Sequence, residues 1–490
     1  MKRHTKFFAT TAIVTMATAL PALALTPEEA WDNWVATTAN FPGLEVTYDD
    51  PTSKNGGLSV ADLQIQANEG DDVFTLTVPE FLIMEDGADA VTMTLPEDAT
   101  VSMLVDGISM KFTLWNDDLV IGASDENGTV SNSISASAIT FTLTEMMEGD
   151  TALDAKGGIE VKDLDFKTTS DGMRSESAFS YDEVTGSAEA VSLKGDKTIG
   201  LNFALDASQT LLTVNGLDTT SEPSLATALR DGFSMQMRNA SAGGRYQFMG
   251  AGNMEMNSDM TWGESEFGLT LDPTGLNLSG TSVDMTSRTV NPDITFGLTI
   301  PKVEMGVSIP LLKSDEPQTA SLLIGYYDML PDMEAGMAPP VIADMVNQPI
   351  TFLVDAEADV ILKQDLVDER AVSAAAQMNP LAMGDVTAIR LNDLNLSGAG
   401  SAALASGAFN LPGGLMAANP SNIPEGTLNV ELKKIPELVE VLQSMGMMTP
   451  DMGMGLMMMQ GMAKEGPDGS MLFDLNTKDG AVTVNGNRIK

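Results

Sequence analysis

Hydrophobic and polar residues alternate along most of the chain with a period of two. Runs of about five to nine residues set Val, Leu, Ile, Thr, Phe or Met against Ser, Asp, Asn or Gly, and clusters of Gly, Asp and Asn separate the runs. Successive side chains of a β-strand point to opposite faces of a sheet, so this pattern is typical of antiparallel β-structure. The sequence predicts a mainly β fold of long curved antiparallel sheets, groove-like or open-barrel-like, with a few short helices.

One strand motif recurs three times, with an Asp-Leu step in the middle of alternating apolar residues. The copies are Leu58–Ile65, Ile159–Phe166 and Ile389–Leu396. In each copy the apolar phase shifts at the Asp-Leu step, which predicts a β-bulge or bend. The unequal spacing of the copies argues against a solenoid. It fits one β-building block that recurs in a long sheet or in two related halves, and convergent strand composition is the alternative.

The clearest helix signal lies just after residue 25. Thr26-Pro27-Glu28-Glu29 supplies a Thr N-cap, a Pro at the first helical position and a Glu for a capping box. Trp31 and Trp34 then share one apolar stripe, so we expect this helix to pack against the first sheet. Further short helices are expected at 221–232, 335–347, 436–445 and 449–464.

The last of these segments is apolar on nearly every face. Its apolar residues include Met452, Met454, Leu456, Met457, Met458, Met459 and Met462. It is too short to span a bilayer. Methionine thioethers can bind Cu(I), but such sites usually recruit His or Cys as well, and we predict no metal site. Met is an adaptable filler for a core or for a hydrophobic groove. We therefore expect Met452, Leu456, Met458, Met459 and Met462 to line an apolar ligand site.

The first 24 residues form an export signal in the expected order. A basic start precedes the apolar stretch Phe7–Leu20, and Ala22-Leu23-Ala24 fits a small-x-small cleavage site. We expect cleavage after Ala24, which leaves no integral membrane segment and predicts a periplasmic protein, with secretion as the alternative. The Pro- and Met-rich stretch near 335–347 favours a boundary between regions 25–330 and 331–490, although 25–490 as one continuous domain is also open.

The chain has no Cys, and its one His, His4, lies in the export signal. Without imidazole or thiol the mature chain cannot build a Ser-His-Asp triad, a Cys-His pair or a zinc site of the usual ligands. The formal net charge of −43 would repel nucleic acid and anionic lipid headgroups. We predict no cofactor and no nucleic-acid partner.

Few catalytic motifs remain. Gly398–Ala403 matches a loose dinucleotide fingerprint, but it lies between two strand-like runs, so we interpret it as a glycine-rich β-turn. A glycosidase-type carboxylate pair is compatible with the 69 acidic residues, which single out no particular pair.

Both ends of the chain carry a family likeness. It rests on Ala30–Trp34 with 43–48, and on 389–396 with 426–432 and 478–486. In these segments the chain resembles an uncharacterised exported family of alphaproteobacteria, domain of unknown function 2125, which brings no catalytic residues. More distantly, its strand-Gly-x-Gly-strand pattern is similar to AsmA-type envelope proteins, whose long β-grooves carry lipid. AsmA-type proteins retain a membrane anchor, and we expect this chain to lack one.

Three functional hypotheses follow. The favoured one is a non-enzymatic periplasmic envelope protein that binds a lipid or other apolar ligand in a β-groove. The alternatives are a carboxylate-dependent hydrolase of envelope polymers and an extracellular structural or adhesive β-protein. A continuous apolar groove, a polar cleft with two facing carboxylates, or neither would distinguish them.

Overall fold

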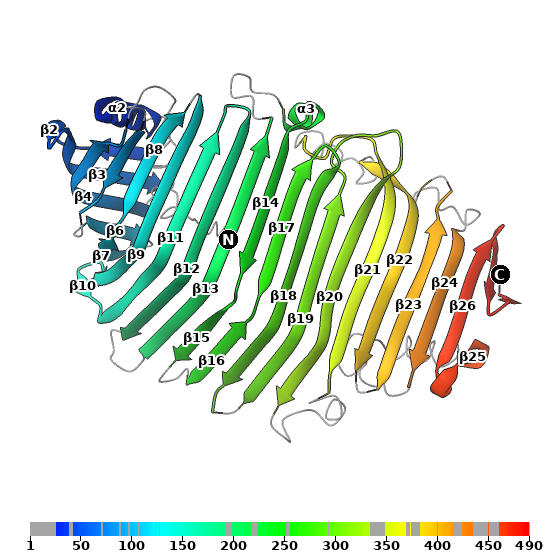
Figure 1. Ribbon diagram of the computed structural model, residues 1–490. Helices are drawn as coiled ribbons and strands as arrows, with labels where there is room; N and C mark the ends of the chain where they lie inside the picture. Colours follow the sequence, from blue (N-terminus) through cyan, green and yellow to red (C-terminus); the bar gives the residue numbers. More distant parts are fainter. Residues whose placement is uncertain are drawn as a thin grey trace. The chain divides into compact units, whose positions relative to one another are not determined.

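The computed structural model describes residues 26–38, 43–191, 198–216, 224–250, 255–333, 348–368, 383–412, 424–434 and 460–489, apart from gaps of one or two residues inside these ranges and a few isolated positions outside them. The described chain is mainly β, with long curved antiparallel strands, as the alternating pattern predicts (Figure 1). Within these ranges no helix is both long enough and apolar enough to cross a membrane.

The chain divides into two compact units. Unit 1 comprises Met1–Thr219 with Asn239–Asp259, and unit 2 comprises Thr220–Arg238 with Met260–Lys490. Two of the three points of division fall inside strands β14 (Ser234–Ser241) and β16 (Met256–Trp262). The boundary expected between residues 330 and 331 lies near the end of strand β20 (Gln318–Met333), and the division into regions 25–330 and 331–490 stays a prediction.

Unit 1 contains one described helix and a long series of strands. Its elements are α2 (Pro27–Thr38), β1 (Leu44–Thr47), β2 (Thr52–Lys54), β3 (Gly57–Glu69), β4 (Asp72–Glu85), β5 (Ala90–Thr94), β6 (Ala99–Val105), β7 (Ile108–Asp117), β8 (Val120–Glu126), β9 (Thr129–Glu148), β10 (Thr151–Ala152), β11 (Ala155–Ser170), β12 (Arg174–Val191), β13 (Thr198–Asn215) and β15 (Gly244–Gly250).

The capping box at the start of α2 is confirmed. The backbone N–H of Glu29 donates to Thr26 Oγ1 at 3.2 Å, and the backbone N–H of Thr26 donates to Glu29 Oε2 at 3.1 Å. Trp31 and Trp34 are buried, and the Trp31 ring lies 6.2 Å from the ring of Phe81 on β4. The helix therefore packs against the first strands, as its aromatic pair predicts.

Strands β4 to β9 close into a ring in unit 1. Strand β4 pairs with β6 through residues 73–77 and with β5 through residues 82–85. Strand β9 likewise pairs with β8 through residues 129–135 and with β7 through residues 138–148. The pairs β6–β7 and β5–β8 complete the circuit. Most of the buried apolar residues of unit 1 belong to the core formed by this ring with α2 and β3.

All three copies of the Asp-Leu motif interrupt their strands. Asp62 and Asp163 each adopt a left-handed backbone with φ +49°, which Asp tolerates better than most residues. At Asp393 the register between β22 (Gly384–Gly398) and its neighbours shifts. The predicted bulge or bend is confirmed at each copy.

The Asp62 interruption has a counterpart in unit 2. Asp62 lies opposite Pro79 in the β3–β4 hairpin, and Asp284, at φ +52°, lies opposite Pro301 in the β18–β19 hairpin. A proline donates no hydrogen bond, so it is tolerated within a sheet where the ladder is already broken. The segments before the two prolines also match, as Phe74-Thr75-Leu76-Thr77-Val78 and Phe296-Gly297-Leu298-Thr299-Ile300. One hairpin design thus recurs in both units.

Unit 2 is a series of long hairpins. Its described elements are α3 (Leu225–Arg230), β17 (Ser265–Asp272), β18 (Gly275–Val290), β19 (Thr295–Ile309), β20, β21 (Ile350–Leu362), β22 (Gly384–Gly398), β23 (Ser401–Asn410), β24 (Glu425–Lys433), η3 (Gln460–Met462), β25 (Lys464–Glu465), η4 (Pro467–Gly469), β26 (Met471–Lys478), β27 (Ala481–Val484) and β28 (Asn487–Arg488).

Several local predictions fall in unit 2. The helix expected at 221–232 is shorter, because α3 begins after its N-cap Ser224, whose side chain accepts a hydrogen bond from the Thr227 N–H. The Gly398–Ala403 segment joins β22 to β23 through Gly400 at φ +75°, which confirms a glycine-rich turn between strands. The helices expected at 335–347 and 436–445 lie outside the described residues.

Candidate functional site

The ring of unit 1 contains an apolar cavity of about 180 Å³. Its lining residues are all Phe, Leu, Ile, Val or Met, and they come from β4, β6, β7, β8, β9 and β11 and from two connections between strands. Val101, Leu114, Ile121 and Ile139 on this lining are almost fully buried. Ile159 also lines the cavity but is 42% exposed. The cavity lining is therefore hydrocarbon throughout, and Ile159 is its most exposed residue.

An apolar face continues from this cavity across five strands of unit 1. Because paired residues lie side by side on the same face, the pairings place three rows of apolar residues and glycines together. These rows, which we name the unit 1 stripe, are Ile139, Val161, Val184 and Leu205; Phe141, Ile159, Gly186, Phe203 and Tyr246; and Gly157, Ala188, Leu201 and Phe248. Phe141, Ile139 and Ile159 belong to both the stripe and the cavity lining.

The reverse face of the same strands is polar. The alternate positions include Glu160, Lys162 and Glu183, and the ammonium of Lys162 lies 2.6 Å from a carboxylate oxygen of Glu183. That contact raises the pKa of Lys162, and the nearby Glu160 adds to the effect. On the stripe itself, a Cβ at Gly186 would lie 2.2 Å from the ring of Phe203, so the glycine lets the ring lie close over the backbone. Unit 1 thus has one apolar and one charged sheet face.

Unit 2 repeats this division between faces over seven strands from β19 to β26. Its apolar rows, which we name the unit 2 apolar face, are Val303, Tyr326, Phe352, Leu396, Ala403, Leu432 and Met471; Met305, Ile324, Val354, Leu394, Ala405, Val430 and Phe473; and Val307, Leu322, Ala356, Leu391, Gly407, Leu428 and Leu475. Met305 is 53% exposed and Leu322 is 40% exposed, so part of this face is open.

Charged networks occupy the reverse face of unit 2. Arg390 on β22 donates to Glu357 at 2.8 Å and to both carboxylate oxygens of Asp359 at 2.7 Å. The guanidinium lowers the pKa of both carboxyl groups. Nearby, burial and a hydrogen bond to Glu304 raise the pKa of Tyr327 to about 12. Within each group the partners lie on neighbouring strands, so these particular charges are paired.

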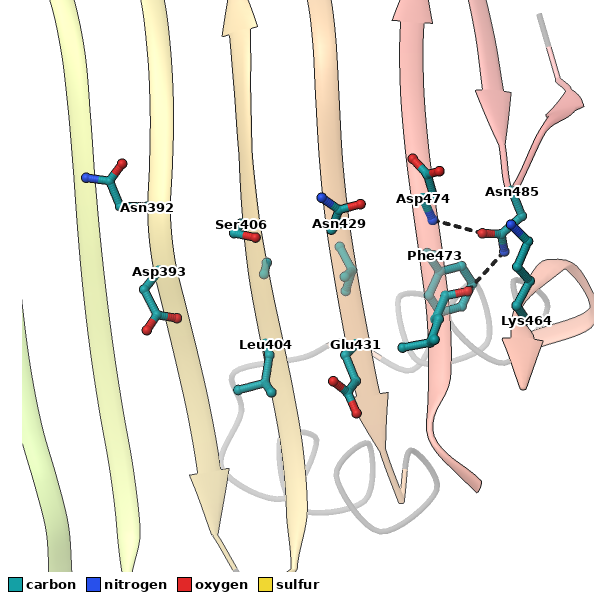
Figure 2. Close-up of a pocket in the computed structure, with 13 residues that line it drawn as sticks. Asn392, Asp393, Leu404, Ser406, Asn429, Glu431, Lys464, Phe473, Asp474 and Asn485 are labelled. Carbon is teal, nitrogen blue, oxygen red and sulfur yellow. Dashed lines mark hydrogen bonds between the residues drawn. The ribbon is translucent and has the colours of Figure 1, made fainter. Parts of the chain in front are cut away.

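A polar cleft of about 460 Å³ lies on the C-terminal strands of unit 2, and Figure 2 shows its lining. Its centre is a row of polar side chains on successive strands, from Asp393 through Ser406 and Asn429 to Asp474. Asn485 closes one end, since its amide donates to two backbone carbonyls and its carbonyl accepts from the Asp474 N–H (Figure 2). The cleft offers hydrogen-bonding groups beside apolar side chains such as Leu404 and Leu472.

The carboxylates of the cleft are poorly arranged for glycosidase chemistry. Asp393 and Asp474 are separated by three strand spacings, about 14 Å, whereas glycosidase carboxyl groups lie roughly 5–9.5 Å apart. Glu431 and Asp474 are on adjacent strands, but their carboxyl groups point to opposite ends of the cleft (Figure 2). Glu431 is also paired with Lys433 at 3.3 Å. Neither pair that includes Asp474 is therefore arranged to act on one reacting bond.

The ligand residues expected from the sequence fall mostly outside the described residues. This applies to Met452, Leu456, Met458 and Met459, and also to the cleavage-site residues Ala22 and Ala24. Met462 is described: it ends the short helix η3 and packs against a small core cluster of Leu432, Phe473 and Val484. The role of the methionine segment in ligand binding stays a prediction.

The sequence reasoning missed the strand residues that form the cavity and the two apolar faces. Their signal was present as period-two alternation, for example at Ile159 and Val161 or at Leu201 and Phe203. Alternation shows that a strand has an apolar face. It does not show which strands lie beside it, so neither the ring nor the rows could be assembled from it.

Neither a metal centre in the described residues nor a known related protein helps to identify the function of these surfaces. In the part of the chain that the structure describes, no group of three or more His, Cys, Asp or Glu is placed to hold a metal ion. No family model matches the chain, and neither does any curated protein or solved structure. The functional argument therefore rests on the two-faced sheets and on the cavity.

Proposed function

We propose that this chain is a non-enzymatic periplasmic envelope protein that binds the acyl chain of a lipid along its apolar sheet faces. The observation that carries the proposal is the segregation of the sheets: apolar rows on one face and charged pairs on the other, in each unit. The export signal that the sequence predicts to end at Ala24, together with the strongly acidic composition, supports the periplasmic location.

The chemistry of the apolar faces suits a hydrocarbon chain. The backbone groups of an internal strand are used in the ladders to its neighbours, so a face made of Val, Leu, Ile and Phe side chains offers no directional partners. A ligand that needs no hydrogen bonds loses nothing by lying there. Large exposed apolar patches on soluble proteins usually mark interaction or ligand sites.

The dimensions also fit. Adjacent strands are about 4.8 Å apart, so the five strands of the unit 1 stripe cover about 19 Å and the seven of the unit 2 apolar face about 29 Å. The hydrocarbon core of a bilayer is about 30 Å thick, so one acyl chain spans about 15 Å. Either face accommodates a whole acyl chain lying across the strands.

The test is binding of palmitate to the purified full chain, measured by calorimetry and by native mass spectrometry. Leu201→Asp places a carboxylate on the unit 1 stripe, and Asn202→Asp adds the same charge to the reverse face of the same strand. Leu322→Asp and Ser321→Asp form the matching pair in unit 2. A buried charge beneath an acyl chain is costly, so Leu201→Asp and Leu322→Asp should each weaken palmitate binding about tenfold or more.

The reverse-face controls should bind like the unmodified protein. A wild-type chain that binds no fatty acid and carries no lipid after gentle extraction would overturn the proposal. Equal loss of binding in both members of a pair would show that charge alone, rather than the apolar face, controls the affinity.

A further inference from the structure

The cavity in the ring of unit 1 is too small for a whole ligand and too large to be a packing defect. Clefts that bind drug-sized molecules are about 300–1,000 Å³, whereas this cavity is about 180 Å³. An apolar cavity of about 150 Å³ stays dry and binds benzene. The ring cavity therefore has room for a short piece of hydrocarbon and for nothing polar.

Ile159 is the most exposed residue of the cavity lining in unit 1. Leu114, Ile121 and Ile139 on the same lining are at most 5% exposed, whereas Ile159 is 42% exposed. Ile159 pairs with Phe141 on one side and with Gly186 on the other, so it stands where the lining meets the unit 1 stripe. An alkyl chain lying on the stripe can thus continue past Ile159 into the cavity without leaving an apolar surface.

We infer that the ring cavity receives the methyl end of an acyl chain and so selects the chain length of the bound lipid. This inference rests on the proposed function and adds to it a definite site and specificity. The rest of the chain lies on the stripe over β12 and β13. An acyl chain too short to reach the cavity leaves the cavity empty. An acyl chain that is too long for the cavity must displace buried side chains of the ring.

Two opposite changes to the cavity test the inference. Val101 lines the cavity at 7% exposure, so Val101→Phe should fill it, and Val101→Leu is a milder filling variant in case the larger ring prevents folding. Phe112 also lines the cavity and is only partly buried, so Phe112→Leu should enlarge it. Circular dichroism establishes that each variant is folded.

The measurement is the affinity of the full chain for a series of saturated fatty acids from caprylate to stearate. Affinity should rise about fourfold for each methylene that reaches an apolar site, and then level off or fall. The filling variants should move that maximum to shorter acids, and Phe112→Leu should move it to longer acids. Leu201→Asp on the stripe should weaken all acids by a similar factor and leave the position of the maximum unchanged.

The outcomes separate this inference from the function on which it rests. If the wild-type chain binds fatty acids and folded cavity variants show the same length profile as the wild type, length selection by the cavity is wrong while acyl binding stands. If the wild-type chain binds none of the acids, both proposals fail.

Discussion

Replacement of Asp163 by Gly and by Val measures the free-energy cost of the left-handed backbone in the middle of β11. Asp163 is exposed and has φ +49°, so its side chain adds little packing and the backbone dominates. A left-handed conformation costs an L-residue about 1–2 kcal/mol, most for a β-branched side chain. Glycine avoids this cost but loses about 0.5–1 kcal/mol in chain entropy. The Gly variant should therefore be more stable than the Val variant by about 1 kcal/mol.

Asp165, two residues along the same strand, is the matched control. It is also exposed, but it pairs regularly with β9 and β12. Here Val suits the strand and Gly weakens it, so the order should reverse by about 1 kcal/mol. Every variant removes one carboxylate, so the charge effect cancels within each pair.

Thermal unfolding followed by tryptophan fluorescence is the assay, since three of the four Trp residues, Trp31, Trp34 and Trp115, belong to unit 1. For a domain of this size about 1 kcal/mol shifts Tm by about 2–4 °C, so the Asp163 pair should differ by about that amount. The same order of Gly and Val at both positions would refute the idea that the Asp-Leu step is a left-handed interruption.

Other predictions concern the cap and the charged face. Thr26→Ala removes the side-chain acceptor for the Glu29 N–H and should cost about 1 kcal/mol of stability, measured by denaturant unfolding against Thr26→Ser, which retains the acceptor. Arg390→Met should cost up to about 1 kcal/mol at neutral pH, because the pair is partly exposed. Arg390 lowers the folded-state pKa of Asp359, so that stabilisation is present above the ordinary carboxyl pKa of 3.8 and is lost as pH falls through the folded value. The stability difference between wild type and Arg390→Met should therefore shrink in acid, and a difference independent of pH would contradict the pairing. In an absorbance titration a late tyrosine step should appear near pH 12 and should vanish in Tyr327→Phe.

The features that the sequence predicted correctly are local ones. The capping box at Thr26 depends on residues one turn apart, and the interruption at Asp62 depends on a phase shift visible within eight residues. Strand character depends only on alternation. In each case the information that determines the structure lies within a short window of the chain.

The ring and its cavity depend on pairings that no short window contains. Along one edge, β4 pairs first with β6 and then with β5, and Pro79 lies between the two paired segments. Whether Ile159 would line a core, a cavity or open solvent is decided by which strand passes beside it. The hydrophobic character of Ile159 was visible in the sequence, but its place on the lining of a cavity was not.

The hairpin order of unit 2 has a consequence for how the chain acquires its structure. From β18 to β24 each strand pairs with the strand immediately before it along the chain, so most contacts join residues of modest sequence separation. Folding rates fall as the sequence separation of contacts grows, and this order keeps the entropy cost of each closure low. Each strand, once formed, presents an unpaired edge as the template for the next. A polypeptide that is exported from its N-terminus can therefore extend this sheet one strand at a time. The edge strand at each stage has unpaired backbone groups, which could pair with another molecule only until the following strand is added.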